Sequence, residues 1–172
     1  IPLKKTINTC ILGAGPGGIT AAIQLKRCGI DFVMMEKNEI GGLLRNAHLI
    51  ENYPGFPNGV SGTELVKLFK RQLDRLHVDV LKDEVINADY NDGLFEVVTA
   101  SSGTVCSMNL IIATGTQPRK LKLGPFPEMA EDLLFYEVVH LKEVEEKKIA
   151  VIGAGDSAFD YALNLARKNR VV

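Results

Sequence analysis

The residues of this sequence that are best suited to chemistry are glycines that follow a short apolar run. Ile7–Leu12 leads into the run GAGPGG at 13–18, which has the spacing G-x-G-x-x-G. Gly13 permits a tight turn, Gly15 lets the backbone approach a pyrophosphate, and Gly18 lets the next helix pack against the strand. Free N–H groups at the start of that helix bind phosphate well, so the run predicts a phosphate cradle.

The elements around these glycines must form a β-α-β unit if the cradle is to work. Residues 7–12 predict a buried parallel strand, Pro16 fits the start of an amphipathic helix, and residues 32–35 predict a second strand. Glu36 ends this second strand, about 20 residues after the glycines, where a carboxylate can accept both ribose hydroxyls of an adenosine. The pattern therefore predicts a dinucleotide-binding unit.

A second glycine turn lies near the end of the sequence. Lys148–Ile152 predicts a buried strand that enters GAGDSA at 153–158, with alanine as the third small residue. A helix over 158–168 should follow, with Phe159 and Leu163 on its core face. Two such turns favour two dinucleotides, and hydride transfer from a nicotinamide to a flavin is the chemistry that needs both.

The stretch between the two turns predicts one further helix and an antiparallel meander. A capping box at Ser61–Glu64 opens a helix with an apolar stripe, and a short strand is expected at 78–81. Strands within 85–99 and at 104–108 are separated by turn residues. Residues 110–115 predict another buried parallel strand, whose small final residues leave room for a ligand. The Gly41-Gly42 turn and the run ENYPGFP (51–57) are, on composition alone, equally compatible with plain connecting loops.

Composition narrows the class of protein. The chain has 172 residues, 46% of them apolar and 24% charged, and its formal net charge is −1. A net charge this close to zero provides no electrostatic attraction to nucleic acid or to an anionic membrane, and we expect neither as a partner. No apolar run reaches membrane-spanning length, and the start has no signal-peptide layout. Three cysteines far apart suit a reducing cytosol, so we expect a cytoplasmic protein, and the isolated histidines predict no metal site.

Taken together, GAGPGG with Glu36, the Gly41-Gly42 turn, ENYPGFP, ATG (113–115) and GAGDSA resemble the thioredoxin-reductase-like flavoproteins over nearly the whole chain. The resemblance implies FAD and NAD(P)H as cofactors. On the FAD side it implies Gly13, Gly15, Pro16, Gly18, Glu36, Lys37, Gly42, Leu43, Asn52, Val85, Ala113, Thr114 and Gly115 as binding positions. On the NAD(P)H side it implies Gly153, Gly155, Asp156, Ser157 and Ala158. It demands no catalytic side chain and no metal ligand.

The fold expected from these features is α/β with two Rossmann-like parts. Residues 1–116 are expected to form an FAD-binding domain of three layers, a parallel sheet with the antiparallel meander inserted. A linker rich in proline is expected at 117–127, and 128–172 should begin an NAD(P)-binding domain that the chain leaves incomplete. We therefore expect the sequence to be a piece of a longer protein, which the resemblance suggests is a homodimer.

One departure from the resemblance bears on the electron acceptor. A thioredoxin reductase places C-x-x-C just before the second turn, whereas residues 133–149 contain no cysteine. The segment, together with Asp160, is closer to the cysteine-less ferredoxin–NADP reductases of thioredoxin-reductase type. The first expectation is thus an FAD-dependent NAD(P)H oxidoreductase that passes electrons to a carrier such as ferredoxin. A thioredoxin-disulfide reductase and a non-catalytic nucleotide-binding fragment stay open as alternatives.

Overall fold

The computed structural model describes residues 6–119, 132–141 and 143–172, which fall into two compact units. The first unit contains the described residues up to Leu44 together with Leu65–Gly115. The second contains Arg45–Glu64 and the described residues from Thr116 onward. Within the described ranges, no helix combines the length and the apolar character that crossing a membrane requires.

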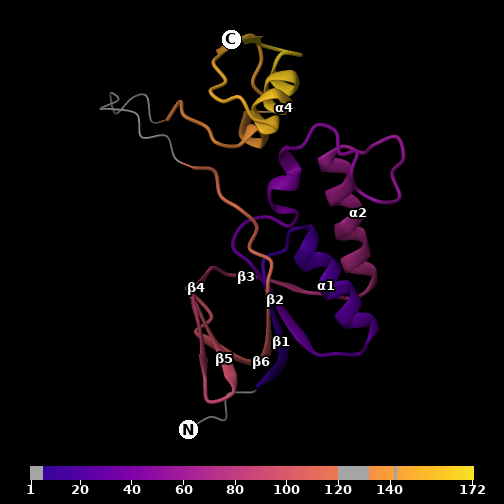
Figure 1. The fold of residues 1–172 in the computed structure, drawn as a ribbon, viewed down its shortest axis with the longest axis vertical. Coiled ribbons are helices and arrows are strands. Elements are labelled where there is room, and N and C mark those ends of the chain that lie inside the picture. Colours follow the sequence, from indigo (N-terminus) through magenta and orange to yellow (C-terminus); the bar gives the residue numbers. More distant parts are fainter. Residues whose placement is uncertain (1–5, 120–131, 142) are drawn as a thin grey trace. The chain divides into compact units, whose positions relative to one another are not determined.

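The chain contains both strands and helices, and Figure 1 labels them where there is room. The strands and helices are β1 (Ile7–Leu12), α1 (Pro16–Arg27), β2 (Phe32–Glu36), η1 (Gly42–Asn46), α2 (Gly62–Arg75), β3 (Val80–Lys82), β4 (Val85–Asn91), β5 (Leu94–Thr99), β6 (Thr104–Ile112), η2 (Val138–Leu141), β7 (Lys148–Ile149), α4 (Asp156–Leu165) and β8 (Arg170–Val171). The expected linker at 117–127 lies largely outside the described residues.

The first unit is built on a six-stranded sheet in the order β3-β2-β1-β6-β5-β4. The strands β3, β2, β1 and β6 run parallel, and β6, β5 and β4 form the predicted antiparallel meander. Cys10 at the centre pairs with Val33 on one side and Leu110 on the other. The β4–β5 turn places Asp92 and Gly93 at φ +49° and +83°, as a two-residue hairpin loop requires. The expected α/β class and its meander are confirmed.

One face of the parallel strands packs against the meander. Cys10, Leu12 and Met35 form a buried cluster there with Val97 of β5. Burial raises the pKa of the Cys10 thiol to about 11, so this cysteine is a core residue with little thiolate at neutral pH.

The opposite face of the sheet packs against α1, which lies with α2 on one side of the strands in Figure 1. Because side chains alternate along a strand, Ile11 and Met34 point away from the meander. Both are fully buried, as are Ile19 and Ala22 of α1. This packing holds the start of α1 at the carboxyl end of β1, where the glycines lie.

The helix α2 begins with the predicted capping contact. The hydroxyl of Ser61 accepts a 3.2 Å hydrogen bond from the N–H of Glu64. Leu65, Phe69 and Leu73 are all buried along one stripe, which confirms the helical period.

Besides a shift of the strand expected at 78–81 to Val80–Lys82, three details of the sequence prediction were wrong. Strand β6 is continuous from Thr104 to Ile112, whereas two separate strands were expected. It continues because it changes partner along its length: its first residues pair with β5 and its last residues with β1. In the second unit the predicted strand shrinks to Lys148–Ile149, because β8 pairs with only these two residues of it.

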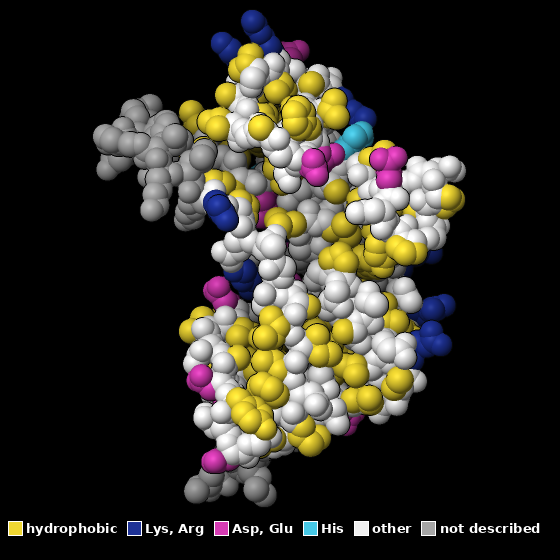
Figure 2. All heavy atoms as spheres, in the orientation of Figure 1, with side chains coloured by type: hydrophobic (Ala, Val, Ile, Leu, Met, Phe, Trp, Pro, Cys, Tyr) yellow, Lys and Arg dark blue, Asp and Glu magenta, His cyan; other side chains and the backbone are white. Residues whose placement is uncertain are grey.

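The third difference concerns the helix after the second glycine turn, which covers Asp156–Leu165 rather than 158–168. Its expected core residues Phe159 and Leu163 are 65% and 66% exposed. Figure 2 shows hydrophobic side chains at the surface of this part of the molecule. Among the described residues no layer covers that face, so the apolar pattern predicted burial that this chain does not provide.

Candidate functional site

The first glycine turn is tightly packed at two of its glycines and open at the third. Gly13 has φ +102°, and a Cβ there would overlap the carbonyl oxygen of Ala113. A Cβ on Gly18 would overlap the carbonyl oxygen of Gly13. At Gly15, by contrast, no atom lies within 4 Å of the position that a Cβ would take. The turn thus leaves a backbone-lined space at Gly15, which fits a bound pyrophosphate.

The space at Gly15 lies at the start of α1. Gly15 is the N-cap residue, with extended backbone at φ −76° and ψ −178°, and Pro16 occupies the first turn. A glycine has no side chain with which to cap the helix, so the first N–H groups of α1 are available to donate to an anion. The positive end of the helix dipole favours the same occupant.

The carboxylate of Glu36 adjoins this turn. Its Oε2 accepts a 2.7 Å hydrogen bond from the N–H of Ala14, and its Oε1 accepts one of 2.9 Å from the N–H of Asn38. These two bonds fix the orientation of the carboxylate at the end of β2. Each oxygen keeps lone-pair capacity for a further donor such as a ribose hydroxyl.

The beginning of β4 approaches the same strand end. The carbonyl of Glu36 accepts a 3.1 Å hydrogen bond from the N–H of Asp83, and Lys37 lies 3.7 Å from a carboxylate oxygen of Glu84. Val85 follows directly and packs against the buried cluster beneath the sheet. The structure therefore brings Glu36, Lys37 and Val85 together, although the last two are 48 positions apart in the sequence.

The Gly41-Gly42 turn lies beside the cradle rather than in a remote loop. The N–H of Gly41 donates a 2.8 Å hydrogen bond to the carbonyl of Ala14. A Cβ on Gly42 would lie 3.8 Å from the Cα of Gly15. A Cβ on Gly41 would overlap Val66 of α2, so this turn needs a small residue for packing as well as for its positive φ.

The second glycine turn, in the second unit, repeats the backbone design of the first. Gly155 is the N-cap of α4, with extended backbone at φ −93° and ψ 170° and no atom within 4 Å of a Cβ position. Gly153 has φ +149°. Ala158 stands at the position that Gly18 occupies in the first turn, so alanine fits here where the first turn requires glycine. A Cβ on Gly153 would lie 3.2 Å from the Cβ of Ala158.

The predicted residues divide between the two units. The first unit holds Gly13, Gly15, Pro16, Gly18, Glu36, Lys37, Gly42, Leu43, Val85, Ala113, Thr114 and Gly115. The second holds Asn52, Gly153, Gly155, Asp156, Ser157 and Ala158. Asn52 is exposed in its loop, and its expected place beside a flavin stays a prediction. Ala14 was not predicted: it acts through its backbone N–H and carbonyl, which no residue type reveals.

Asp83 was also missed, and its role is structural. Its buried carboxylate accepts hydrogen bonds of 3.1 Å and 2.8 Å from the N–H groups of Ser101 and Ser102. The Ser102 hydroxyl first, and then the Thr99 hydroxyl and nearby N–H groups, hold the pKa of Asp83 well below its usual range, while burial opposes them. The residue thereby anchors the β5–β6 turn to the strands that line the cradle.

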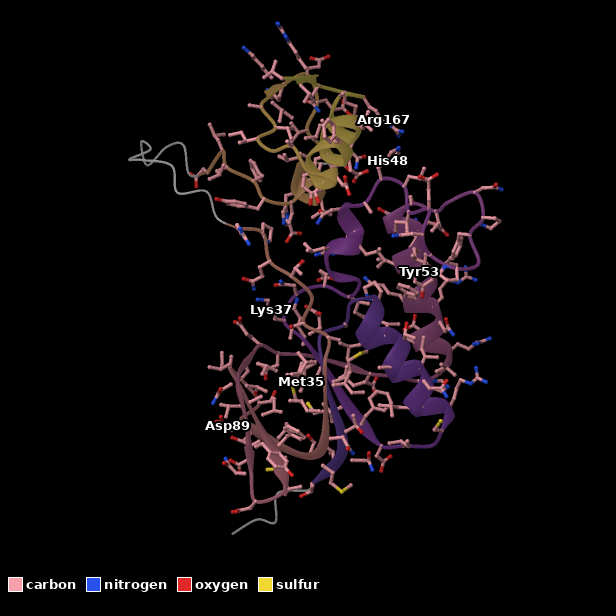
Figure 3. All side chains as sticks on the ribbon, viewed as in Figure 1. Met35, Lys37, His48, Tyr53, Asp89 and Arg167 are labelled. Carbon is pink, nitrogen blue, oxygen red and sulfur yellow. The ribbon has the colours of Figure 1, made fainter. Side chains whose placement is uncertain are left out.

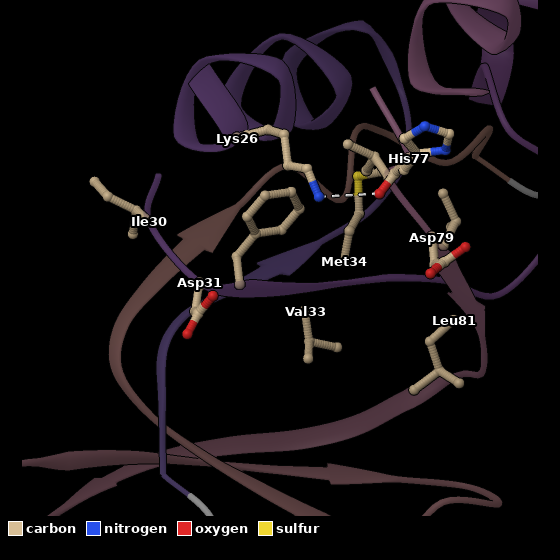
Figure 4. Close-up of a pocket in the computed structure, with 11 residues that line it drawn as sticks. Lys26, Ile30, Asp31, Val33, Met34, His77, Asp79 and Leu81 are labelled. Atoms are coloured by element: carbon tan, nitrogen blue, oxygen red, sulfur yellow. Dashed lines mark hydrogen bonds between the residues drawn. The ribbon is translucent and has the colours of Figure 1, made fainter. Parts of the chain in front are cut away.

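A separate pocket of about 520 Å³ opens at the opposite end of β2 (Figure 4). Lys26 crosses it and donates a 3.1 Å hydrogen bond to the carbonyl of His77, with Phe32 and Met34 among the lining residues. None of the predicted cofactor positions lines this pocket, so the glycine turns remain the candidate site. Over the described ranges, no three His, Cys, Asp or Glu side chains are grouped to hold a metal ion.

Comparison with known proteins is consistent with this arrangement. Residues 7–172 match the family described as pyridine nucleotide-disulphide oxidoreductase. A thioredoxin reductase of Streptomyces coelicolor is 35% identical over 168 residues, covering 93% of this chain and 50% of that protein. A ferredoxin–NADP reductase of Lacticaseibacillus paracasei is 37% identical over 172 residues, covering 95% of this chain and 52% of that protein.

Among solved structures, the thioredoxin reductase of Lactococcus lactis has a TM-score of 0.84 at 30% sequence identity. The match covers 96% of this chain and 55% of that one. The chain thus spans about half the length of the curated relatives it matches. Members of the matched family bind FAD and use NADPH. On the match over 7–172, the chain belongs to the pyridine nucleotide-disulphide oxidoreductase family.

Proposed function

We propose that this chain carries the dinucleotide-binding turns of a flavin-dependent reductase, with FAD at the first turn and NAD(P)H at the second. The observation that carries the proposal is the open backbone at Gly15, next to an oriented carboxylate at Glu36. The equivalent open position at Gly155 supports a second dinucleotide. When bound, FAD accepts a hydride from the nicotinamide and returns electrons to an acceptor.

The residues of the chain bind and orient these cofactors. The N–H groups at the start of α1 hold the FAD pyrophosphate, and Glu36 accepts the adenosine ribose hydroxyls. Gly42 lies against Gly15 and leaves the same cradle open on its other side. In the second unit the start of α4 holds the NAD(P)H pyrophosphate. Asp156 lies in the first turn of α4, where a negative side chain interacts favourably with the helix dipole.

For the electron acceptor we propose a one-electron carrier of the ferredoxin kind. The supporting observation is the absence of cysteine from 133–149, where a disulfide reductase of this type carries its thiol pair. The three cysteines of the chain are free: Cys10 and Cys106 are buried, and Cys28 is exposed. The sequence contains no C-x-x-C pair to relay electrons as an internal disulfide.

The second candidate is a reductase of thioredoxin-type disulfides. It is favoured by the thioredoxin reductases of several species among the relatives. The third is a nucleotide-binding piece without activity of its own, which the half-length coverage supports. We further propose the division at 1–116 and 128–172, a homodimer for the longer protein, and a reducing cytosol as its compartment.

The three candidates separate in one assay series with the protein purified from its complete reading frame. After loading with FAD, NADPH oxidation is measured with ferredoxin, with thioredoxin and with no acceptor. Reduction of ferredoxin but not thioredoxin supports the proposal. Faster reduction of thioredoxin contradicts the acceptor, and a protein that binds neither FAD nor NADPH contradicts the reductase assignment.

A further inference from the structure

The last residue of η1 and the residues that follow it are attached to η2 and α4 by a set of polar contacts within the second unit. Asn46 is buried, and its Oδ1 accepts a 3.0 Å hydrogen bond from the N–H of Val139. The Nδ2 of Asn164 lies 3.4 Å from the carbonyl of Asn46. None of these groups changes charge between pH 5 and 8.

The contact at His48 is different because it depends on a proton. The N–H of His48 donates to both carboxylate oxygens of Asp160, at 3.3 Å and 3.2 Å. On the ring, Nε2 lies 2.7 Å from Nη2 of Arg167, and Figure 3 shows the two side chains together. A guanidinium can only donate, so Nε2 must accept, and the ring must be neutral with its proton on Nδ1.

We propose that His48 makes the attachment of residues 46–51 to α4 dependent on pH. Protonation of His48 removes the acceptor and places a second cation against the Arg167 guanidinium. The attachment is therefore complete when the imidazole is neutral and weakens when the ring gains a proton. This inference does not depend on the proposed electron acceptor or cofactors.

Charged and titratable groups lie on both sides of this contact. Those of α4, of η2, of the residues next to them and of the segment itself include Asp156, Asp160, Arg167, Lys168, Glu137, His140, Arg45 and Glu51. Asp160 would attract a protonated ring, and its two oxygens lie at the backbone N–H of His48, 3.3 Å and 3.2 Å from the nitrogen. Burial first, and then the charges of Glu137 and Asp160, raise the pKa of Tyr161, so both carboxylates act on this side of α4. The 2.7 Å contact places Arg167 directly at the ring nitrogen, so repulsion from Arg167 decides the outcome.

The first test is the tautomer of His48 in the unmodified 172-residue chain. Nitrogen-15 correlation spectra at pH 8 should show a proton on Nδ1 and none on Nε2. A proton on Nε2 at that pH would overturn the inference, because the ring could not then accept from Arg167. This measurement needs no variant, so it stands even if the substitutions below impair folding.

The second test is hydrogen exchange of the His48 amide, corrected for the intrinsic effect of pH. Protection should fall roughly three- to tenfold between pH 8 and pH 5.5, the effect of losing one charge-assisted contact near the surface. His48→Gln keeps an acceptor that does not titrate, so its protection should stay constant. His77→Gln is the matched control and should keep the wild-type fall, because His77 is exposed and lies in the first unit. Equal protection of the wild-type amide at both pH values would contradict the proposal.

Discussion

The N–H of Ala14 donates a 2.7 Å hydrogen bond to Oε2 of Glu36, which joins the first glycine turn to the end of β2. The two residues are 22 positions apart, so this bond closes the β-α-β unit at the end where the glycine turn lies. It places a carboxylate one residue from the open backbone at Gly15. The proposed FAD site depends on that juxtaposition.

Gly15→Val should abolish FAD binding without unfolding the protein. The backbone at Gly15 is extended and the space around it is open, so valine fits the fold but fills the place of the pyrophosphate. We expect affinity for FAD to fall by at least about 100-fold, equivalent to roughly 2.7 kcal/mol. Calorimetry with FAD and thermal unfolding measure the two effects, with Gly17→Ala in the same turn as the control. Undiminished affinity would count against the cradle.

Gly13→Ala should instead damage the fold. Gly13 has φ +102°, and its Cβ would overlap the Ala113 carbonyl. Strain and overlap together should lower the free energy of unfolding by at least about 2 kcal/mol. Denaturant unfolding gives the value, and a stability equal to that of wild type would show that the turn relaxes more easily than its packing indicates.

Glu36→Ala should weaken FAD binding by about 10- to 100-fold, because the adenosine ribose loses a charged acceptor. Glu39→Ala is a suitable control: Glu39 is exposed, and its carboxylate lies 3.9 Å from Lys70 and 3.8 Å from Lys82 in surface ion pairs. Fluorescence titration with FAD compares the two variants. Equal affinities would remove Glu36 from the site.

Asp83→Asn should change how stability depends on pH. The pKa of Asp83 is lowered in the fold, chiefly by the Ser102 hydroxyl. A lowered pKa contributes stability that is complete above the unfolded value near 3.9 and is lost as pH falls below it. The variant should be less stable at pH 7 and should lose less stability on acidification than wild type. Thermal unfolding from pH 7 to pH 2.5 measures both slopes, and the exposed Asp79→Asn should keep the wild-type slope.

Thiol labelling should find one reactive cysteine in the native chain. Cys10 and Cys106 are buried and Cys28 is exposed, so only Cys28 should react quickly. All three should react after denaturation, whether or not the protein was first treated with oxidant at low concentration. Mass spectrometry counts the labels. A pair of thiols lost together on mild oxidation would revive the disulfide-reductase alternative.

The sequence predicted the first unit well where a local pattern has one structural solution. Ile7–Leu12 is a strand between its predicted limits, and Pro16 begins the helix after it. The Asp92-Gly93 turn also follows from residue type alone, because both positions need positive φ. In these places backbone sterics and hydrophobic period agree, so little is left for tertiary packing to decide.

Other features depend on contacts that no local pattern contains. The hydrogen bond from Gly41 to Ala14 joins backbone groups of residues 27 positions apart, so no local sequence pattern predicts it. The acceptors that surround Asp83 come from a turn 18 and 19 residues away. The exposed face of α4 shows the reverse case, since Phe159 is patterned for a core that the described residues do not supply.

The most direct test of the central claim is competition between adenine nucleotides and FAD on the purified chain. If the first turn binds a pyrophosphate and an adenosine ribose, FAD should bind, ADP should compete with it, and FMN, which lacks the AMP part of FAD, should not bind at this site. Calorimetric titration of each compound, alone and against FAD, gives the result. Absence of FAD binding, or binding that ADP does not displace, would contradict the account.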